Sequence, residues 1–399
     1  MAYMNTQVKE GAADEGAAGD GEAWRLRRST AWRQAGRILS RLPQDGTLGE
    51  QLAALAADAG AVTDLGQAAD IYGNGVVGEL EQRVAGLLGT EAAAFFPTGT
   101  MAQQVALRCW AGRTGNTTVA LHPLAHPEVH EGGALGAVSG LRTVHPASGP
   151  RLPTADEIRD FPEPFGTLML ELPLRDAGFV LPAWEELEAV VAAARERDAV
   201  VHFDGARLWE CATHFGRGLP EIAALADSVY VSFYKSLGGI SGAVLAGSAS
   251  LVEEARVWRH RYGGLPFQQF PAAVAALAGL DRELPKLPSY VAQAKVVAEA
   301  LTEGFTQAGA GWFRVRPEPP QTHQFQVWLP YGADELTEAS VRQAEETGTA
   351  LFRRWFTPDT GAPGVSFTEV TVTEAGLEWT AQDVRDAVAA FLERVPGKS

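Results

Sequence analysis

Two hydrophobic periods alternate along the first two thirds of the chain. Short apolar runs predict buried strands at residues 92–96, 119–121, 166–172, 200–204 and 228–233. Between them, apolar residues at helical spacing predict helices at residues 77–88, from about 101 onward, at 184–197 and at 219–225. Strands and helices that alternate in this way indicate a mainly parallel sheet with right-handed crossovers. We expect an α/β fold whose large domain spans residues 64–263.

The pattern changes after the apolar run at residues 272–277. A long helix at residues 288–307 precedes a strand at 324–329, a helix at 335–347, strands near 351–356 and 365–372, and a final helix at 380–395. Thr380 with Asp383 forms a plausible N-terminal cap for that last helix. This order predicts a smaller α+β domain in residues 264–399, including its connecting helix.

The first 63 residues contain two kinds of segment. Residues 1–23 are rich in Gly, Ala, Glu and Asp, and their few large apolar residues predict a disordered tail. Residues 24–63 follow as an N-terminal arm and a helix over about 47–59. In the arm, arginines from Arg25 to Arg41 alternate with Trp24 and Trp32. We interpret it as an arm that packs across a partner subunit, with a substrate-contacting arm as the alternative.

Composition limits the possible partners and compartments. The 399 residues are 46% hydrophobic, enough for a large core, and carry a net charge of −16. That charge argues against nucleic acid or an anionic membrane as the main partner. Two cysteines, Cys109 and Cys211, cannot form a disulfide framework. With neither a signal-peptide pattern nor an apolar run near the roughly 20 residues of a membrane span, we expect a cytoplasmic protein.

Ionisable residues follow two neighbouring strands. Asp204 ends the strand that begins at Val200, and Lys235 follows the next one. In an open α/β sheet, ligands bind at the carboxyl ends of strands. Pyridoxal phosphate (PLP) requires a lysine for its Schiff base and an acidic partner for its pyridinium nitrogen. Thr98, Gly99 and Thr100 form a strand-to-helix turn of the kind that binds phosphate.

Several short segments together resemble the L-threonine aldolase branch of the β-eliminating lyase group, over roughly residues 69–280. They occur in that family's order and spacing. The resemblance implies a fold-type-I PLP-dependent enzyme, built as a dimer or tetramer of identical chains. The segments are Tyr72-Gly73, residues 97–102, residues 202–208, Lys235 to Gly238, residues 242–247 and Trp258 to Arg261.

The resemblance also implies a role for each matching residue. Lys235 is then the lysine that binds PLP, and Asp204 the partner of its ring nitrogen. His126 matches the histidine that stacks on the ring and is the best candidate for the catalytic base. Arg207 matches the residue that binds the substrate carboxylate, and Tyr72 is a further substrate contact. The phosphate is then held by Thr98, Gly99 and Thr100.

A metal site is the alternative reading of the histidines. His122, His126 and His130 recur every four residues, a spacing that can bind zinc on a helix. Pro123 and Pro127 interrupt such a helix, so the three imidazoles would not share one face. We therefore expect no metal and assign His126 to the cofactor, leaving His122 and His130 without a role.

The chain departs from the family pattern at three places. Ser366 stands near the position of a second carboxylate-binding arginine, and Phe267-Gln268-Gln269 replaces a phosphate-binding arginine. Leu172-Pro173-Leu174 replaces an Asn-Thr-His segment. The candidates to replace these arginines are Arg175, Arg259, Arg261 and the arginines of the N-terminal arm. The 10 tryptophans, Trp209 among them, suggest an aromatic substrate space, although core packing is the usual role of a tryptophan.

The leading hypothesis is a PLP-dependent lyase that cleaves or forms the Cα–Cβ bond of a β-hydroxy-α-amino acid, with glycine and an aldehyde as the cleavage products. A PLP-dependent β-elimination, β-replacement or transamination is the first alternative. A non-catalytic descendant of the fold is the second. The two enzymatic hypotheses both predict a small amino acid as the substrate.

Overall fold

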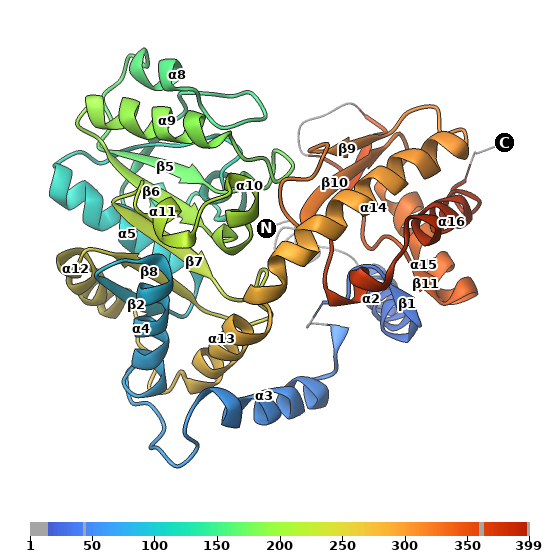
Figure 1. Cartoon of the computed structure of the whole chain (residues 1–399), viewed down its shortest axis with the longest axis horizontal. Coiled ribbons are helices and arrows are strands. Elements are labelled where there is room, and N and C mark those ends of the chain that lie inside the picture. Colours follow the sequence, from blue (N-terminus) through green and yellow to red (C-terminus); the bar gives the residue numbers. More distant parts are fainter. Residues whose placement is uncertain (1–14, 43–44, 359–362, 397–399) are drawn as a thin grey trace. The chain divides into compact units, whose positions relative to one another are not determined.

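A computed structural model describes residues 15–42, 45–358 and 363–396 of the chain. These residues form two compact units (Figure 1). Unit 1 comprises the chain up to Gln51 together with residues from Lys286 onward, and unit 2 comprises Leu52–Pro285. Residues 1–14 of the segment predicted to be disordered lie outside the described residues.

Unit 2 is built on a seven-stranded sheet with the order β2-β8-β7-β6-β5-β3-β4. β8 runs antiparallel to both of its neighbours, and the other adjacent pairs are parallel. The mainly parallel sheet predicted from the sequence is therefore confirmed. The strands are β2 (Ala92–Phe96), β3 (Thr118–Ala120), β4 (Arg142–Val144), β5 (Thr167–Glu171), β6 (Val200–Gly205), β7 (Ser228–Ser232) and β8 (Ala243–Gly247).

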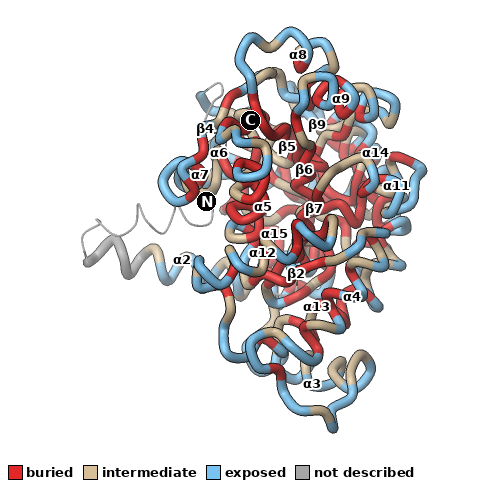
Figure 2. Tube along the Cα trace, turned by 90° about the vertical axis from the view of Figure 1, so that its left-hand side faces the viewer, coloured by how far each residue is buried: buried red, intermediate tan, exposed pale blue. Residues whose placement is uncertain are grey.

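Helices cover both faces of this sheet, and Figure 2 shows its buried strands between α5 on one side and α11 on the other. One core packs α5 and α12 against the sheet through residues such as Val105, Leu245 and Leu251. The helices of this unit are α4 (Val76–Leu88), α5 (Gly99–Thr114), α6 (His126–His130), α7 (Ala134–Ala137), α8 (Ala155–Arg159), α9 (Trp184–Glu196), η3 (Leu208–Glu210), α10 (Ala212–Phe215), α11 (Leu219–Ala223), α12 (Ala249–Arg261), α13 (Phe270–Arg282) and η4 (Leu284–Lys286), whose last residue lies in unit 1.

The boundary expected after residue 263 falls inside unit 2. α13 lies beyond that point, yet it packs against α4 of the same unit and buries Val274, Leu277 and Leu280. An apolar helix that packs on the large unit belongs to it, whatever the change of pattern along the chain.

Unit 1 contains a three-stranded antiparallel sheet of order β12-β10-β9 and a separate parallel pair, β1 with β11. Its core includes Leu301, Phe325, Trp355 and Phe391. The elements are α2 (Glu15–Gln34), β1 (Arg37–Ile38), α14 (Leu287–Gln307), β9 (Arg314–Arg316), β10 (Gln324–Leu329), α15 (Ala333–Thr347), β11 (Thr349–Ala350), β12 (Ser366–Thr371), η5 (Glu374–Glu378) and α16 (Ala381–Leu392); α3 (Leu48–Val62) runs from this unit into unit 2.

The strand predicted near residues 351–356 is wrong. The chain there is irregular apart from a bridge between Phe356 and Phe367. Leu351, Phe352 and Trp355 are all buried in one core, a spacing that does not alternate as a strand requires. The predicted cap of the last helix is confirmed, because Thr380 and Asp383 form a capping box at the start of α16.

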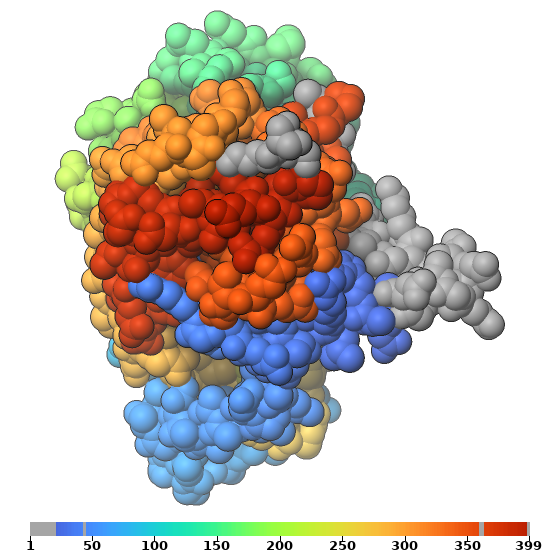
Figure 3. All heavy atoms as spheres, turned by 90° about the vertical axis from the view of Figure 1, so that its right-hand side faces the viewer, coloured from blue at the N-terminus to red at the C-terminus, as the bar shows by residue number. Residues whose placement is uncertain are grey.

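The N-terminal arm packs on the C-terminal part of its own chain, as the blue and red-orange atoms in Figure 3 show. Arg27 pairs with Glu338 and Glu345 of α15 at 3.0 and 2.7 Å. Acidic residues of α15 thus bind this arginine within the chain, and the packing of the arm across a partner subunit stays a prediction. α2 also begins at Glu15, inside the segment predicted to be disordered.

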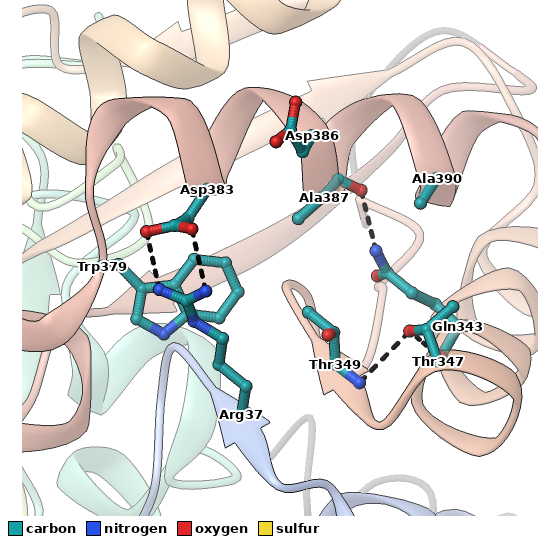
Figure 4. Close-up of a pocket in the computed structure, with 9 residues that line it drawn as sticks. All are labelled: Arg37, Gln343, Thr347, Thr349, Trp379, Asp383, Asp386, Ala387 and Ala390. Atoms are coloured by element: carbon teal, nitrogen blue, oxygen red, sulfur yellow. Dashed lines mark hydrogen bonds and ion pairs between the residues drawn. The ribbon is translucent and has the colours of Figure 1, made fainter.

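A cavity of about 270 Å³ lies where this arm meets α15 and α16 (Figure 4). Arg37 pairs with Asp383 at 2.6 Å and stacks 4.9 Å from the ring centre of Trp379. Gln343 donates to the carbonyl of Ala387. These contacts attach β1 to the C-terminal helices of unit 1.

Candidate active site

The carboxyl ends of the parallel strands in unit 2 bring most of the predicted site residues into one pocket. Five of them line it, whereas Thr98, Arg207 and Tyr72 do not. The remaining wall residues were not predicted. The lining residues are Gly99, Thr100, Gln103, His126, Glu131, Asp204, Ala206, Tyr230, Tyr234 and Lys235.

The turn before α5 is suited to an anion. Thr98 is the N-cap, and its side chain accepts a hydrogen bond from the Met101 backbone at 3.3 Å. Thr98 therefore supports the turn, whereas Gly99 and Thr100 in the first turn of α5 line the pocket. Tyr230 packs so closely on Gly99 that a Cβ atom there would collide with the phenol oxygen. The unpaired N–H groups and dipole of a helix N-terminus favour a phosphate group at this place.

Asp204 is at the end of β6 and is 2% exposed. Its Oδ1 accepts a hydrogen bond from the Ala206 backbone at 3.1 Å. Burial raises the pKa of Asp204, and the electrostatic interaction with His126 opposes that rise. A positively charged group in the pocket would therefore stabilise the ionised carboxylate.

Lys235 lies three residues beyond β7. Its Nζ is 4.8 Å from the ring centre of Tyr234, which also lines the pocket. Tyr230 is directly opposite Asp204 in the register of β6 and β7, so the two side chains share one face of the sheet. Neither tyrosine was predicted, because the strand register that brings Tyr230 beside Asp204 is not visible in a single sequence.

Glu171 lies next to Asp204 on the neighbouring strand, paired with it in the register of β5 and β6. Its two oxygens accept hydrogen bonds from the backbones of His126, at 2.8 Å, and Arg175, at 3.2 Å. Burial, followed by the negative charge of Asp204, raises the pKa of Glu171 to about 8. Glu171 thus holds the loop that positions His126.

The stability of the cofactor-free protein should therefore depend on the protonation of Glu171. The folded protein keeps this proton up to about pH 8, whereas the unfolded chain releases it near the ordinary value of 4.5. The stabilisation is complete below pH 4.5 and is lost as the pH rises towards 8. We expect Glu171→Gln to reduce the loss of unfolding free energy between pH 6 and 9 by on the order of 3 kcal/mol.

Urea unfolding of the cofactor-free protein at several pH values measures this difference. Glu188→Gln is the matched control, because Glu188 is exposed on α9. Its pH profile should coincide with that of the wild type. Equal slopes for Glu171→Gln and the wild type would contradict the assignment.

Two imidazole–carboxylate pairs lie side by side at the pocket, and the first of them, His126 with Glu131, forms part of its wall. His126 Nδ1 is 3.3 Å from Glu131 Oε1, and His130 Nε2 is 2.6 Å from Asp176 Oδ2. The two imidazole rings are 5.2 Å apart between centres. Glu131 therefore orients His126, a contact that the sequence analysis missed because Glu131 resembles an ordinary charged residue of a loop.

His122 has a structural role. Its Nε2 bonds to the carbonyl of Gly149 at 2.7 Å, and its Nδ1 accepts from the Leu124 backbone at 3.0 Å. Both ring nitrogens are thus engaged in holding the turn. Across residues 15–42, 45–358 and 363–396, no group of three or more His, Cys, Asp and Glu residues is arranged to hold a metal ion.

Arg207 is buried beside the site rather than on the pocket wall. It is 7% exposed, and its guanidinium carbon lies 5.4 Å from the ring centre of Phe179. Within the part of the chain that the structure describes, Arg207 makes no ion pair, and its Nε has no hydrogen-bond partner. A buried guanidinium in this state is ready to bind an anion.

Tyr72 is on the loop before α4 and is 57% exposed. Its φ of 52° is unusual for a bulky residue, and a hydrogen bond to the Phe267 carbonyl at 2.9 Å fixes it there. The two rings meet edge to face with 5.4 Å between centres. The substrate contact predicted for Tyr72 is not formed within this pocket and stays a prediction.

The other residues singled out in the sequence, among them the arginines considered as replacements for the missing family arginines, make structural contacts. Arg259 is bound by Glu81 and the carbonyl of Phe95, and Arg261 stacks on Trp258. Trp209 is 2% exposed and donates to the Ser232 carbonyl, so it is a core residue. Ser366 is also buried, and its hydroxyl donates to the Tyr331 carbonyl. Arg175 lies beside the His130–Asp176 pair, with its Nη1 at 3.3 Å from His130 Nε2.

The chain is similar to known proteins over most of its length. Residues 50–324 match the family model of the β-eliminating lyases. Low-specificity L-threonine aldolase 1 of Arabidopsis thaliana is 30% identical over 284 residues, which cover 69% of this chain and 77% of the relative. The low specificity L-threonine aldolase of Escherichia coli K12 is 32% identical over 241 residues, or 59% of this chain and 72% of the relative.

Solved structures extend this similarity to nearly the whole chain. The proposed L-allo-threonine aldolase of Listeria monocytogenes has a TM-score of 0.82 and 34% identity, covering 92% of this chain and 99% of that one. The serine palmitoyltransferase of S. paucimobilis, solved with a PLP–myriocin adduct, has a TM-score of 0.61 at 19% identity and so shares the fold alone. The fold is that of the fold-type-I PLP-dependent enzymes, and the chain belongs to the β-eliminating lyase family.

Proposed function

We propose that the protein is a PLP-dependent lyase that cleaves or forms the Cα–Cβ bond of a β-hydroxy-α-amino acid. In the cleavage direction its products are glycine and an aldehyde. The relatives from Arabidopsis thaliana and Escherichia coli, both L-threonine aldolases by name, support this reaction. The observation that carries the proposal is the pocket in which Lys235, Asp204 and the N-terminus of α5 meet.

The residues of the pocket fit PLP at three separate points. The first turn of α5 offers N–H groups to a phosphate, and the missing Cβ of Gly99 lets that turn pack closely on Tyr230. Asp204 supplies a carboxylate for a protonated ring nitrogen. Lys235 supplies an amine for a carbonyl group. An anion, a cation and a carbonyl carbon on one small molecule would satisfy all three.

Bound PLP would supply an electron-withdrawing ring that stabilises negative charge at the substrate α-carbon. Asp204 would hold the proton on the ring nitrogen. His126, on the pocket wall, would remove the proton of the substrate β-hydroxyl, and Glu131 would keep its Nδ1 side fixed. Arg207, with no ion pair in the described chain, would bind the substrate carboxylate through two parallel hydrogen bonds.

Product analysis with the purified, PLP-loaded protein tests the reaction. We expect glycine and an aldehyde in equal amounts from a β-hydroxy-α-amino acid such as L-threonine or L-allo-threonine. Ammonia with a keto acid would instead indicate β-elimination, and an amino group passed to an added keto acid would indicate transamination. PLP binding without turnover of any substrate in a broad panel would identify a non-catalytic protein.

A homo-oligomer is part of the same proposal. Unit 2 exposes large apolar side chains that a monomer would leave in water, and five of them on or near α3 and the loops at residues 71–72 and 267 are 50–67% exposed. Burial of such side chains against a second copy of the chain would remove them from water. Sedimentation equilibrium should give a dimer or a tetramer, and a monomer at micromolar concentration would contradict this. These side chains are Leu52, Leu65, Ile71, Tyr72 and Phe267.

The cytoplasm is the compartment we propose. Both cysteines of the described chain are buried and free, which suits a reducing environment. None of the helices in the described ranges has the length and apolar character needed to cross a membrane.

A further inference from the structure

Gln103 is a buried wall residue of the pocket whose function neither the sequence nor the family match indicates. It lies on α5, one helical turn after Gly99, and is 1% exposed. Its Oε1 is 2.7 Å from Nε2 of His202. Its Nε2 is also buried and has no hydrogen-bond partner among the described residues. A buried amide donor without a hydrogen-bond partner is unfavourable, so we expect an acceptor to bind the Nε2 group of Gln103 when the pocket is occupied.

A chain of hydrogen bonds orients the Gln103 amide. Trp110 Nε1, which can only donate, bonds to Ser228 Oγ at 2.7 Å. The Ser228 hydroxyl lies 2.7 Å from Nδ1 of His202 and has its own hydrogen to donate there. Burial lowers the pKa of His202 to about 3, so its ring is neutral and carries a single hydrogen. With Nδ1 as the acceptor, that hydrogen is on Nε2 and is donated to Gln103 Oε1.

The opposite orientation of the amide is disfavoured by Asp204. If the hydrogen bonds from Ser228 to His202 and from His202 to Gln103 both ran in the opposite direction, the amide oxygen of Gln103 would face the pocket. His202 and Asp204 are two residues apart on β6, so their side chains leave the same face of the strand. An amide oxygen facing a carboxylate there would be repelled, whereas an N–H group would be attracted.

Asp204 has room for this donor. Within the described chain, its carboxylate accepts a hydrogen bond from the Ala206 backbone at Oδ1. Glu171 on the adjacent strand adds a second carboxyl group beside it. A buried carboxylate needs hydrogen bonds to remain ionised, and a side-chain N–H is the kind of donor that supplies one.

We propose that Gln103 is a positioning residue that donates its Nε2–H to Asp204 in the cofactor-loaded site, with the Trp110–Ser228–His202 chain setting the direction of that bond. Gln103 thereby keeps Asp204 ionised for the ring nitrogen of PLP. The inference rests on the proposed function, since it needs PLP as the occupant of the pocket. It assigns Gln103 to cofactor binding without any direct contact to the reacting atoms.

Cofactor affinity, measured by absorbance titration of the cofactor-free protein with PLP, tests this role. Gln103→Met keeps the length of the side chain and removes its donor. We expect it to weaken PLP binding by about tenfold to a hundredfold, the usual effect of losing a hydrogen bond to a charged group. Gln103→Glu, which is nearly isosteric, should weaken binding further at pH 8 and recover as the pH is lowered.

Gln104→Met is the matched control. Gln104 is the next residue of α5 and is equally buried, but its amide meets Ser139 and it does not line the pocket. Its PLP affinity should equal that of the wild type. Circular dichroism melting of all three variants establishes that each is folded.

A cofactor analogue separates the proposed role from simple packing. In 1-deaza-pyridoxal phosphate a carbon replaces the ring nitrogen, so the charge on Asp204 no longer contributes to binding. Gln103→Met and the wild type should bind this analogue equally well. An equal loss for PLP and the analogue, or no loss for PLP, would overturn the role of Gln103 and leave the proposed function intact. Failure of the wild type to bind PLP would overturn the proposed function itself.

Discussion

Replacing Lys235 with alanine is expected to abolish the covalent attachment of PLP and with it the activity. Lys235 is the lysine of the pocket and lies beside Asp204, Tyr234 and the first turn of α5. Without its amine, the long-wavelength absorbance of the cofactor–lysine adduct should disappear. The rate of substrate cleavage should fall by at least about a thousandfold, as is usual when an enzyme loses a group that bonds covalently to its reactant.

The matched control for this variant is Lys295→Ala. Lys295 is an exposed residue of α14 in unit 1. This variant should keep both the absorbance band and the wild-type rate. A Lys235→Ala protein that retains the band and unaltered activity would refute the assignment of Lys235 and the pocket with it.

Asp204→Asn should have the second-largest effect, a fall in kcat of about a hundredfold to a thousandfold. Asparagine keeps the shape of the side chain and an oxygen for the Ala206 backbone, so the turn after β6 is preserved. It cannot carry the negative charge that keeps a ring nitrogen protonated. Because Lys235 is still present, the adduct band should remain while turnover is lost.

Asp227→Asn provides the comparison. Asp227 also bonds to β6, but at the amino end of the strand, where its Oδ2 accepts from the Val201 backbone at 2.7 Å. Loss of charge at that end should leave kcat unchanged within a factor of about two. Steady-state kinetics of the two variants distinguish a charge requirement at the cofactor from a general effect on the strand. Equal kcat values for both variants would contradict the role of Asp204.

Several elements of both units were predictable because each combines a clear period with clear ends. Residues 92–96 and 324–329 are strands with the predicted bounds, and the apolar residues of 184–196 form the predicted helix α9. By contrast, Leu351, Phe352 and Trp355 are as apolar as strand residues but fill one core without alternating. Composition alone cannot distinguish these two cases, since both bury large side chains.

The arm at residues 24–41 illustrates the same difficulty for charged residues. Arginines beside tryptophans indicate a surface that binds something, and Arg27 and Arg37 do make ion pairs. Their partners, Glu345 and Asp383, are more than 300 residues away in the sequence. No local pattern links such residues, so these ion pairs within the chain became visible only in the tertiary structure.

The sequence by itself determined the mainly parallel sheet, the resemblance to the threonine aldolases and the positions of Lys235, Asp204 and His126. These depend on local periods and on residues at strand ends, which a linear pattern records. Only the tertiary structure decided that Glu131 and Glu171 hold His126 and its loop, that Arg207 is buried without an ion pair in the described chain, and that Gln103 lies between His202 and the pocket. Each of these depends on strand register or on contacts between distant segments, which arise only when the chain packs.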